Sequence, residues 1–304
     1  MYRKIIKIAD KTYVITLPLA WLSKYNLQKG DELNLQENSN ELTITAAVKN
    51  NRQFISVSIE SLDDRVIRWL LSALHKSGYD EIELFYNNTQ QLQLVNELLK
   101  DLFTGFTITE KTEKRLVISA IVEEQQEQFD NSFRRAFRVT IEMADETAAK
   151  IKQRDYNFQQ TKKLELLNNQ LTNFCQRIIN KHRIIEYKKA NFLYVILWNL
   201  EKICDNYKYI CNHFEQQDDK DKQISQEIIS LFEKVNSFFS LYYDLYYNFS
   251  LEKLTHISKQ QEIIKNELIN FKARNHSEMF LFNICSQILT QTADFSASII
   301  VLNK

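Results

Sequence analysis

The sequence predicts a multidomain, mainly α-helical protein that begins with a small β-rich region. Only three glycines and one proline occur among its 304 residues, and these are the residues that break helices and form tight turns. Pro18 and all three glycines lie before Phe106, so neither residue type interrupts the chain beyond it. Because 304 residues exceed the usual size of a single core, we expect two or three domains.

Residues 1–48 predict a β, β, short helix, β, β unit. RKIIKI and TYVITL, residues 3–8 and 12–17, are short β-type runs, and LPLAWLSKYNL reads as one or two helical turns entered at Pro18. Gly30 supplies a turn into GDELNL, and NSNELTIT completes a second hairpin. A chain of about 45 residues struggles to bury an adequate core, so we expect this unit to dimerise in order to fold.

Residues 50–123 predict a small α/β domain with the order β-α-β-α-β-β. The strands QFISVSI and DEIELFYN flank an amphipathic helix, SLDDRVIRWLLSALHKSGY, which we expect to begin at a serine cap and to end near Gly78. A second helix, QLQLVNELLKDLF, precedes Gly105, where the chain turns into FTITEKTEK and RLVISAIV. We expect the sheet on one side and both helices on the other.

Residues 124–304 predict helices throughout. Apolar residues recur three and four positions apart, as in IIEYKKANFLYVILWNLEKICDNYKYI. The expected helices span about 128–153, 155–181, 184–216, 220–249, 251–273 and 277–302. Their short connections allow either two antiparallel three-helix bundles or one elongated six-helix bundle. The aromatic-rich stretch VNSFFSLYYDLYYNF, residues 235–249, is predicted to pack in the core.

Charge and cysteine usage narrow the functional class. Lys plus Arg and Asp plus Glu number 39 each, so any contact with nucleic acid must come from a local patch. The four cysteines lie in apolar helical patterns without CxxC spacing, which favours reduced, buried thiols. The first residues lack a signal-peptide core, and the apolar stretches fall short of the roughly 20 residues of a membrane span. We therefore expect a cytoplasmic protein without membrane insertion.

Carboxylates spaced four residues apart are the candidate metal ligands. Glu201 and Asp205 project from one helical face, one turn apart, and such a pair can hold a divalent or iron-type cation. The alternative is a solvated acidic pair. The same spacing recurs in Glu165 with Asn169, Glu262 with Asn266, and Thr290 with Asp294. The candidate ligand set is therefore Glu201, Asp205, Glu165 and Asp294.

The remaining candidate groups are three arginines and five histidines. Arg134, Arg135 and Arg177 place positive charge near these helices, either as surface charge or ion pairs, or as a contact for an anion or a partner. The sequence has no glycine-rich loop, GxSxG or HExxH motif, and its histidines show no ligand spacing. We therefore expect that the protein is not an enzyme.

The stretch RKIIKIADKTYVITLPLAWLSKYNLQKGDELNL, within residues 3–46, resembles the SpoVT/AbrB-type swapped-hairpin module. The shared features are a basic first strand, an apolar strand that ends in LP, a W-L helical turn and L-x-x-GDEL. The resemblance implies an obligate dimer that, in many relatives, binds DNA through basic residues of the first strands. The candidate phosphate contacts are Arg3, Lys4, Lys7 and Lys11. Residues 1–48 carry six basic and five acidic side chains, which predicts weak, strongly salt-dependent binding, or none.

Residues 50–304 resemble the PhoU-type phosphate-uptake regulators, in particular archaeal-type members that join an AbrB-like N-terminus to a PhoU-like helical region. The resemblance implies a pair of three-helix bundles with E/DxxxD motifs on neighbouring helices, which hold metal clusters in some members. Glu201 and Asp205 match the intact motif, whereas Asn or Thr replaces a carboxylate in the other three pairs. Each replacement removes an anionic ligand from such a cluster.

The presence of both resemblances in one chain predicts a dimeric regulator of phosphate homeostasis. Its N-terminal module would contact promoter DNA, and its helical module would sense a signal or engage a partner. The alternative is a protein that binds no DNA, dimerises through the same module, and restrains a phosphate transporter's ATPase or a signalling kinase. A third hypothesis is a metal-dependent sensor that uses Glu201 and Asp205.

Overall fold

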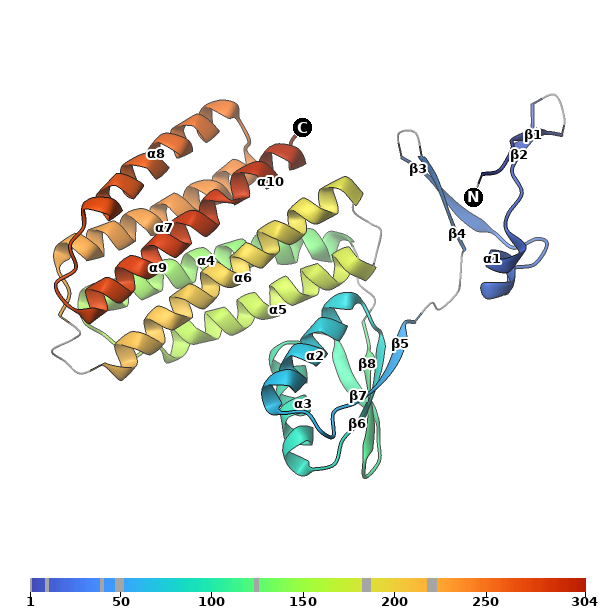
Figure 1. Cartoon of the computed structure of the whole chain (residues 1–304), viewed down its shortest axis with the longest axis horizontal. Coiled ribbons are helices and arrows are strands. Elements are labelled where there is room, and N and C mark those ends of the chain that lie inside the picture. Colours follow the sequence, from blue (N-terminus) through green and yellow to red (C-terminus); the bar gives the residue numbers. More distant parts are fainter. Residues whose placement is uncertain are drawn as a thin grey trace. The chain divides into compact units, whose positions relative to one another are not determined.

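The structure is a computed structural model that describes residues 2–8, 11–38, 41–46, 52–122, 126–181, 187–217 and 223–304. The chain falls into two compact units, Met1–Arg52 and Gln53–Lys304, which we call the N-terminal unit and the helical unit (Figure 1). The domain boundaries predicted at 48–50 and 123–124, and the helix starts predicted at 184 and 220, lie outside the described residues. Within the described ranges, no helix combines the length and the apolar character needed to cross a membrane.

The N-terminal unit consists of two antiparallel hairpins with a short helix between them, as the sequence predicts. Its elements are β1 (Ile6–Lys7), β2 (Tyr13–Val14), α1 (Leu19–Lys24), β3 (Leu33–Asn38) and β4 (Glu41–Ala46). β1 pairs with β2, and β3 pairs with β4. Pro18 precedes α1 with a φ of −66°, which suits a helix start. Gly30 has a φ of 101°, in the left-handed region that favours glycine.

The described residues of the N-terminal unit form no core of their own. None of its described side chains is buried, and Ile8, Leu19 and Leu35 are 67%, 80% and 57% exposed. In the part that the structure describes, the two hairpins form separate two-stranded sheets. Because an isolated two-stranded hairpin is marginally stable in water, these apolar side chains need a partner surface.

The helical unit begins with a four-stranded sheet covered on one face by two helices. Its elements are β5 (Phe54–Ser58), α2 (Asp64–Ser77), β6 (Glu81–Phe85), α3 (Thr89–Asp101), β7 (Phe106–Lys111) and β8 (Arg115–Ala120), which confirms the predicted order. The strand order is β5-β6-β8-β7, with β5 and β6 parallel and the other neighbours antiparallel. The inward side chains Ile82 and Leu84 lie in one small core with Leu71 of α2 and Leu94 of α3.

The predicted serine cap of α2 is wrong. The N-cap residue is Asp63, whose Oδ1 accepts a hydrogen bond from the backbone N of Val66 at 2.9 Å. Asp caps a helix as well as Ser does, and the sequence SLDD offers both residue types. At the other end, Gly78 is the C-cap with a φ of 96°, so this part of the prediction is confirmed.

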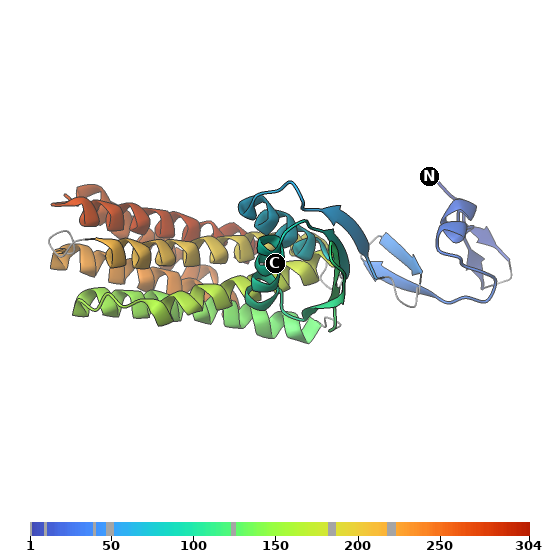
Figure 2. The same ribbon diagram turned by 90° about the horizontal axis from the view of Figure 1, so that it is seen from below.

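The rest of the helical unit is a bundle whose helices run along a common direction (Figure 2). Its elements are α4 (Gln126–Gln153), α5 (Gln159–Lys181), α6 (Tyr187–Gln216), α7 (Gln226–Tyr247), α8 (Leu251–Asn270), α9 (His276–Ala293) and α10 (Phe295–Leu302). α4, α5 and α6 contact one another, as do α7, α8 and α9, and α4 with α7 and α6 with α9 join the two groups. One continuous core serves both groups and includes Phe238 and Phe239 of the aromatic-rich stretch.

The last helix, predicted at 277–302, is divided into α9 and α10, which meet at Asp294. Phe295, directly after the division, is fully buried and lies against the rings of Phe137 and Tyr242. No glycine or proline marks the division, so the sequence pattern does not reveal it. The break between the two helices places Phe295 in the core, and its contacts with these two rings favour the break.

A buried arginine ties the sheet to the bundle within the helical unit. Arg177 of α5 is fully buried, and its Nη1 donates to the carbonyl oxygens of His75 at 3.1 Å and Tyr79 at 2.7 Å. Its Nη2 donates to Oδ1 of Asp80 at 2.7 Å, and Lys181 Nζ lies 2.6 Å from the same oxygen. Of the alternatives left open for Arg177 by the sequence, the structure supports an ion pair, and this pair is internal.

We predict that Arg177→Met lowers the free energy of unfolding of the helical unit by about 3–5 kcal/mol, because the change removes the main partner of a buried carboxylate. Urea unfolding followed by helical circular dichroism measures the loss. Arg274→Met is the matched control, since the Arg274 side chain is 68% exposed and little change is expected. An equally small loss for Arg177→Met would contradict the structural role of this ion pair.

Candidate functional site

The four predicted DNA contacts lie together on the first hairpin. Arg3 and Lys4 precede β1, Lys7 lies within it, and Lys11 precedes β2. All four side chains are exposed, and none forms an ion pair with another described residue. Their charged groups are therefore available to the phosphate oxygens of a nucleic acid, which are the commonest acceptors in protein–DNA complexes.

Exposed apolar side chains share this hairpin with the cations. Lys7 is directly opposite Tyr13 in the strand register, and Ile6 is opposite Val14. Tyr13 is 64% exposed, although a tyrosine in a stable sheet usually packs against a neighbour. The hairpin therefore presents both a surface that needs covering and charges that need counterions.

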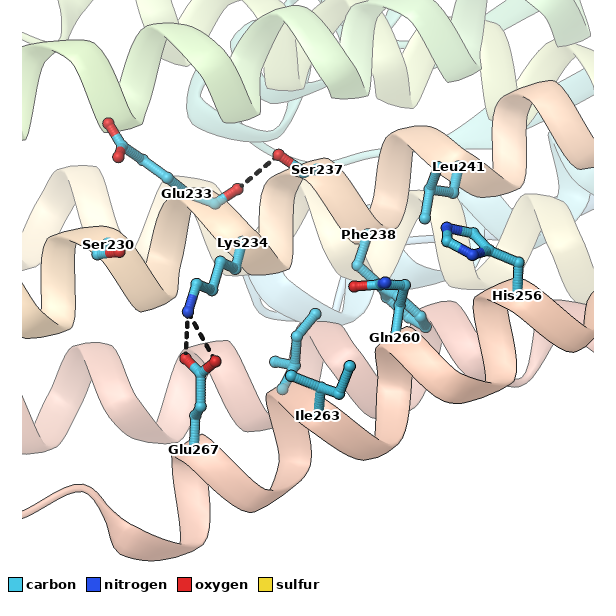
Figure 3. A pocket seen from close by; sticks show the side chains of 11 residues that line it. Ser230, Glu233, Lys234, Ser237, Phe238, Leu241, His256, Gln260, Ile263 and Glu267 are labelled. Carbon is cyan, nitrogen blue, oxygen red and sulfur yellow. Dashed lines mark hydrogen bonds and ion pairs between the residues drawn. The ribbon is translucent and has the colours of Figure 1, made fainter. Parts of the chain in front are cut away.

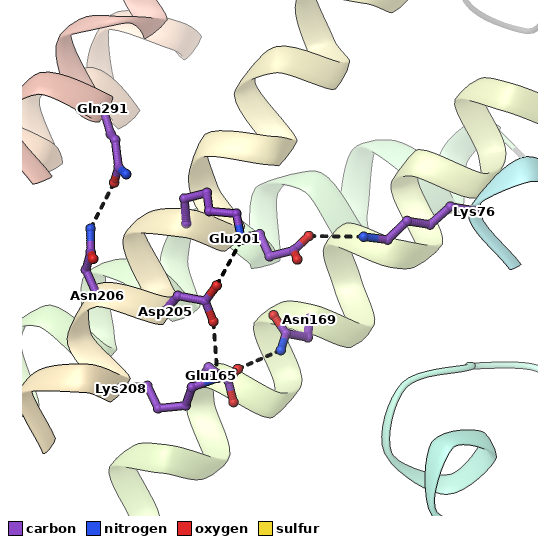
Figure 4. Close-up of polar contacts among 9 residues, drawn as sticks. Lys76, Glu165, Asn169, Glu201, Asp205, Asn206, Lys208 and Gln291 are labelled. Carbon is purple, nitrogen blue, oxygen red and sulfur yellow. Dashed lines mark hydrogen bonds and ion pairs between the residues drawn. The ribbon is translucent and has the colours of Figure 1, made fainter. Parts of the chain in front are cut away.

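Two of the predicted metal ligands, Glu165 and Asp205, are brought together by a lysine (Figure 4). Lys208 Nζ of α6 lies 2.5 Å from Oε1 of Glu165 on α5 and 3.1 Å from Oδ1 of Asp205. Asn169 Nδ2 also donates to Oε1 of Glu165, at 2.7 Å. We call these four residues the Lys208 cluster. Burial alone would lower the pKa of Lys208, but its hydrogen bond to Glu165 and the two negative charges raise that pKa above its ordinary value.

The other two predicted ligands form no hydrogen bond or ion pair with the Lys208 cluster. Oε2 of Glu201 accepts a hydrogen bond from Lys76 Nζ at 3.3 Å, and Asp294 is exposed where α9 meets α10. Among the described residues, no group of three or more His, Cys, Asp or Glu side chains could hold a metal ion. The divalent or iron-type metal therefore stays a prediction, and a metal at the Lys208 cluster would have to displace the ammonium group.

Lys208 was not predicted to pair with these carboxylates, although its spacing from Asp205 indicates one of the two contacts. It follows Asp205 by three positions, a spacing that places both side chains on the same helical face. Its second partner, Glu165, is 43 positions earlier on a neighbouring helix, and no sequence pattern gives that contact. Glu262 and Asn266, the repeated pair on α8, are exposed and lie on a different helix from the Lys208 cluster.

A groove between α7 and α8 was also not predicted from the sequence (Figure 3). Its volume is about 530 Å³, within the range of small-molecule sites. It is lined by Ser230, Glu233, Lys234, Ser237, Phe238, Leu241, His256, Gln260, Ile263, Ile264 and Glu267. Lys234 Nζ lies 2.6 Å from both carboxylate oxygens of Glu267 and so links the two helices. Ser237 Oγ, also in this lining, donates to the carbonyl oxygen of Glu233 at 3.0 Å.

A basic first hairpin, a short helix and a second hairpin make up this small β module. A family model described as antidote-toxin recognition MazE, bacterial antitoxin, matches residues 6–52. This segment covers both hairpins and is less than a fifth of the chain. No curated protein and no solved structure matched the chain. The match agrees with the swapped-hairpin module expected from the sequence and indicates a regulator of the DNA-binding or antitoxin type.

We predict that Lys208→Met lowers the free energy of unfolding by about 1–3 kcal/mol at pH 7, because the largely buried Glu165 loses its charged partner and Asp205 keeps only Lys202, at 3.2 Å. Below the pKa of an unfolded lysine, about 10.4, Lys208 is protonated in both states and its contribution is complete. As the pH rises through the higher folded pKa, this contribution is lost. The difference between wild type and variant should therefore narrow above about pH 10, as measured by urea unfolding from pH 7 to 11.

The matched control for this prediction is Lys234→Met, which removes an ion pair whose lysine side chain is 47% exposed. We expect only a small loss of stability from this control, because exposed ion pairs contribute little. If wild type and Lys208→Met keep the same difference in stability at every pH, the assigned role of the Lys208 ammonium is wrong.

Proposed function

We propose that this protein is a dimeric DNA-binding regulator in which two N-terminal units pair and present their basic hairpins to duplex DNA. The observation that carries the proposal is a unit with exposed apolar residues, no buried side chain among its described residues, and four cations on one hairpin. The match of residues 6–52 to an antitoxin family model supports it. The helical unit then senses a signal or engages a partner.

Pairing resolves the stability problem of the N-terminal unit. A second copy carries the same exposed apolar residues, so a two-fold contact can cover both sets at once. Removing this apolar surface from water is the main favourable contribution to association. Pairing also doubles the number of cations that one DNA duplex can meet, and each neutralised phosphate releases condensed counterions.

We predict that the full chain binds duplex DNA from its own upstream region with an affinity that falls steeply with salt. The double substitution K4A/K7A removes up to four phosphate contacts per dimer. The slope of log K against log salt should become shallower by about 0.9 for each lost contact. Fluorescence anisotropy between about 50 and 200 mM salt measures the affinity and the slope.

The control for DNA binding is Lys29→Ala, which removes a cation of the same unit outside the first hairpin. We expect this variant to keep the wild-type slope. Absence of binding near 50 mM salt would count against the DNA role, and so would a slope that K4A/K7A leaves unchanged.

We further propose that phosphate availability is the signal, and this part rests on the sequence resemblance of residues 50–304. Genome-wide DNA occupancy under phosphate-rich and phosphate-poor growth tests this proposal. Occupancy that is the same under both conditions would contradict it.

A metal-dependent form of sensing is a separate proposal. Elemental analysis of the wild type and of Glu201→Ala tests that proposal, because a metal held by this carboxylate should be lost from the variant.

A second candidate function is partner binding without DNA. The matching family model is described by antidote-toxin recognition, and the groove between α7 and α8 offers a binding surface in the helical unit. The partner would be a toxin-type protein, a phosphate transporter's ATPase or a signalling kinase. Pull-down of each purified candidate with residues 53–304 tests this second function, because it requires capture by the helical unit, and failure of every candidate to bind would count against it.

We predict that residues 124–304 alone capture any such partner less well than residues 53–304. The shorter fragment lacks Asp80, so it leaves the Arg177 guanidinium without its buried partner and destabilises α5. Circular dichroism of both fragments, run beside the pull-down, measures this loss of structure. Equal thermal stability of the two fragments would show that the bundle does not depend on the sheet.

A further inference from the structure

Helix α4 carries a row of charged side chains on the face that points away from the core. The six residues of this row are Glu127, Arg134, Arg138, Glu142, Asp145 and Lys152, and all are exposed. They follow one another at spacings of three, four and seven, which keep them on one side of a helix. We call this surface the α4 face.

The order of charges on the α4 face inverts when the helix is read backwards. From the N-terminus the signs are negative, positive, positive, negative, negative, positive, and from the C-terminus every sign is opposite. Two copies of α4 placed antiparallel about the level of Thr140 therefore set Arg134 beside Asp145 and Arg138 beside Glu142 of the other copy. A parallel arrangement would place like charges together, which is destabilising.

The centre of the α4 face is a groove rather than a flat surface. The groove has a volume of about 730 Å³ and is lined by Arg138, Ile141, Glu142, Asp145, Glu146, Ala149 and Tyr243. Ile141 and Tyr243 give it an apolar part, and the small side chain of Ala149 allows another helix to approach. Exposed ion pairs alone contribute little to stability, so this apolar part is needed for association.

The central charges of the α4 face take part in no ion pair among the residues that the structure describes. Arg138, Glu142 and Asp145 form no ion pair with another described residue. Towards the ends of the row, Lys152 pairs with Glu233 at 2.7 Å. Burial already raises the pKa of Asp145, so a cation placed beside this carboxylate would be favourable. The groove is therefore lined by one cation and three carboxylates, of which Glu146 accepts a hydrogen bond from Thr161 and the other two are unpaired among the described residues.

We propose that the α4 face is a two-fold contact between two copies of this chain, with the α4 helices antiparallel. The inverted charge order selects a second copy as the occupant, because the surface is complementary to itself. The contact is weak by itself and rests on the proposed pairing of the N-terminal units, which holds the two chains at a high effective concentration.

Disulfide crosslinking of the full chain tests the contact. The four native cysteines are buried, and burial raises the pKa of Cys211 to about 12, so an introduced surface cysteine reacts selectively. Ile141→Cys lies within roughly 4 Å, along the helix axis, of its counterpart in the antiparallel pair. Asn131→Cys is the matched control, because it is exposed on the same helix but lies roughly 26 Å from its counterpart.

We expect Ile141→Cys to form the crosslinked dimer about ten-fold faster than Asn131→Cys, because contact adds to the effective concentration that pairing supplies. Adding R138E to the Ile141→Cys chain should abolish this difference, since like charges then face each other. Adding R138E and E142R together should restore it.

Sedimentation equilibrium of the same samples separates this proposal from the proposed function. A dimer in which Ile141→Cys crosslinks no faster than the control overturns the α4 contact and leaves the dimeric regulator intact. A chain that sediments as a monomer and does not crosslink overturns both. Crosslinking that R138E leaves unchanged, or that the double swap does not restore, contradicts the charge matching.

Discussion

In the residues that the structure describes, the N-terminal unit buries none of its apolar side chains, and the proposed function depends on this constraint. Its two hairpins form separate two-stranded sheets in the described residues, and none of their described side chains is fully buried. A surface of this kind is stable only against a partner, and an identical copy is the partner that every molecule has available. Pairing would bring together the two basic hairpins, and it would also hold two helical units near each other.

The helical unit, by contrast, is held together within one chain, because buried ion pairs join its sheet to its bundle. Oδ1 of Asp80 accepts from Arg177, while Oδ2 accepts from the backbone N of Gln53 at 3.0 Å. Gln53 is the first residue of the helical unit, so one carboxylate holds both the point of entry of the chain and α5. A second ion pair, between Lys76 of α2 and Glu201 of α6, connects the same sheet domain to the next helix. These contacts make the α/β domain a fixed part of the helical unit.

The sequence predicts most of the helices and strands, but it does not predict the contacts between them. Pro18 and Gly30 locate the turns of the N-terminal unit because each has one strong conformational preference, and helical spacing locates the bundle. Arg177 could not be assigned, because its partners are about a hundred positions away and a buried arginine looks like a surface one in sequence. The carboxylate spacing predicted a metal ion held by Glu201 and Asp205, with Glu165 and Asp294 as further candidates, and the metal stays a prediction. The structure shows Lys208 bound to Glu165 and Asp205, a contact between two helices that the spacing alone does not give.

Hydrogen exchange of the full chain tests the central constraint most directly. The exchange is measured across a dilution series, and native mass separates the monomer from the dimer. We expect amides of residues 2–46 to be protected in the dimer and to exchange at nearly unfolded rates in the monomer, because only the dimer covers the hairpins. Amides of residues 53–304 should be protected equally in both. Protected hairpin amides in a monomeric chain would contradict the dependence of the N-terminal unit on a partner.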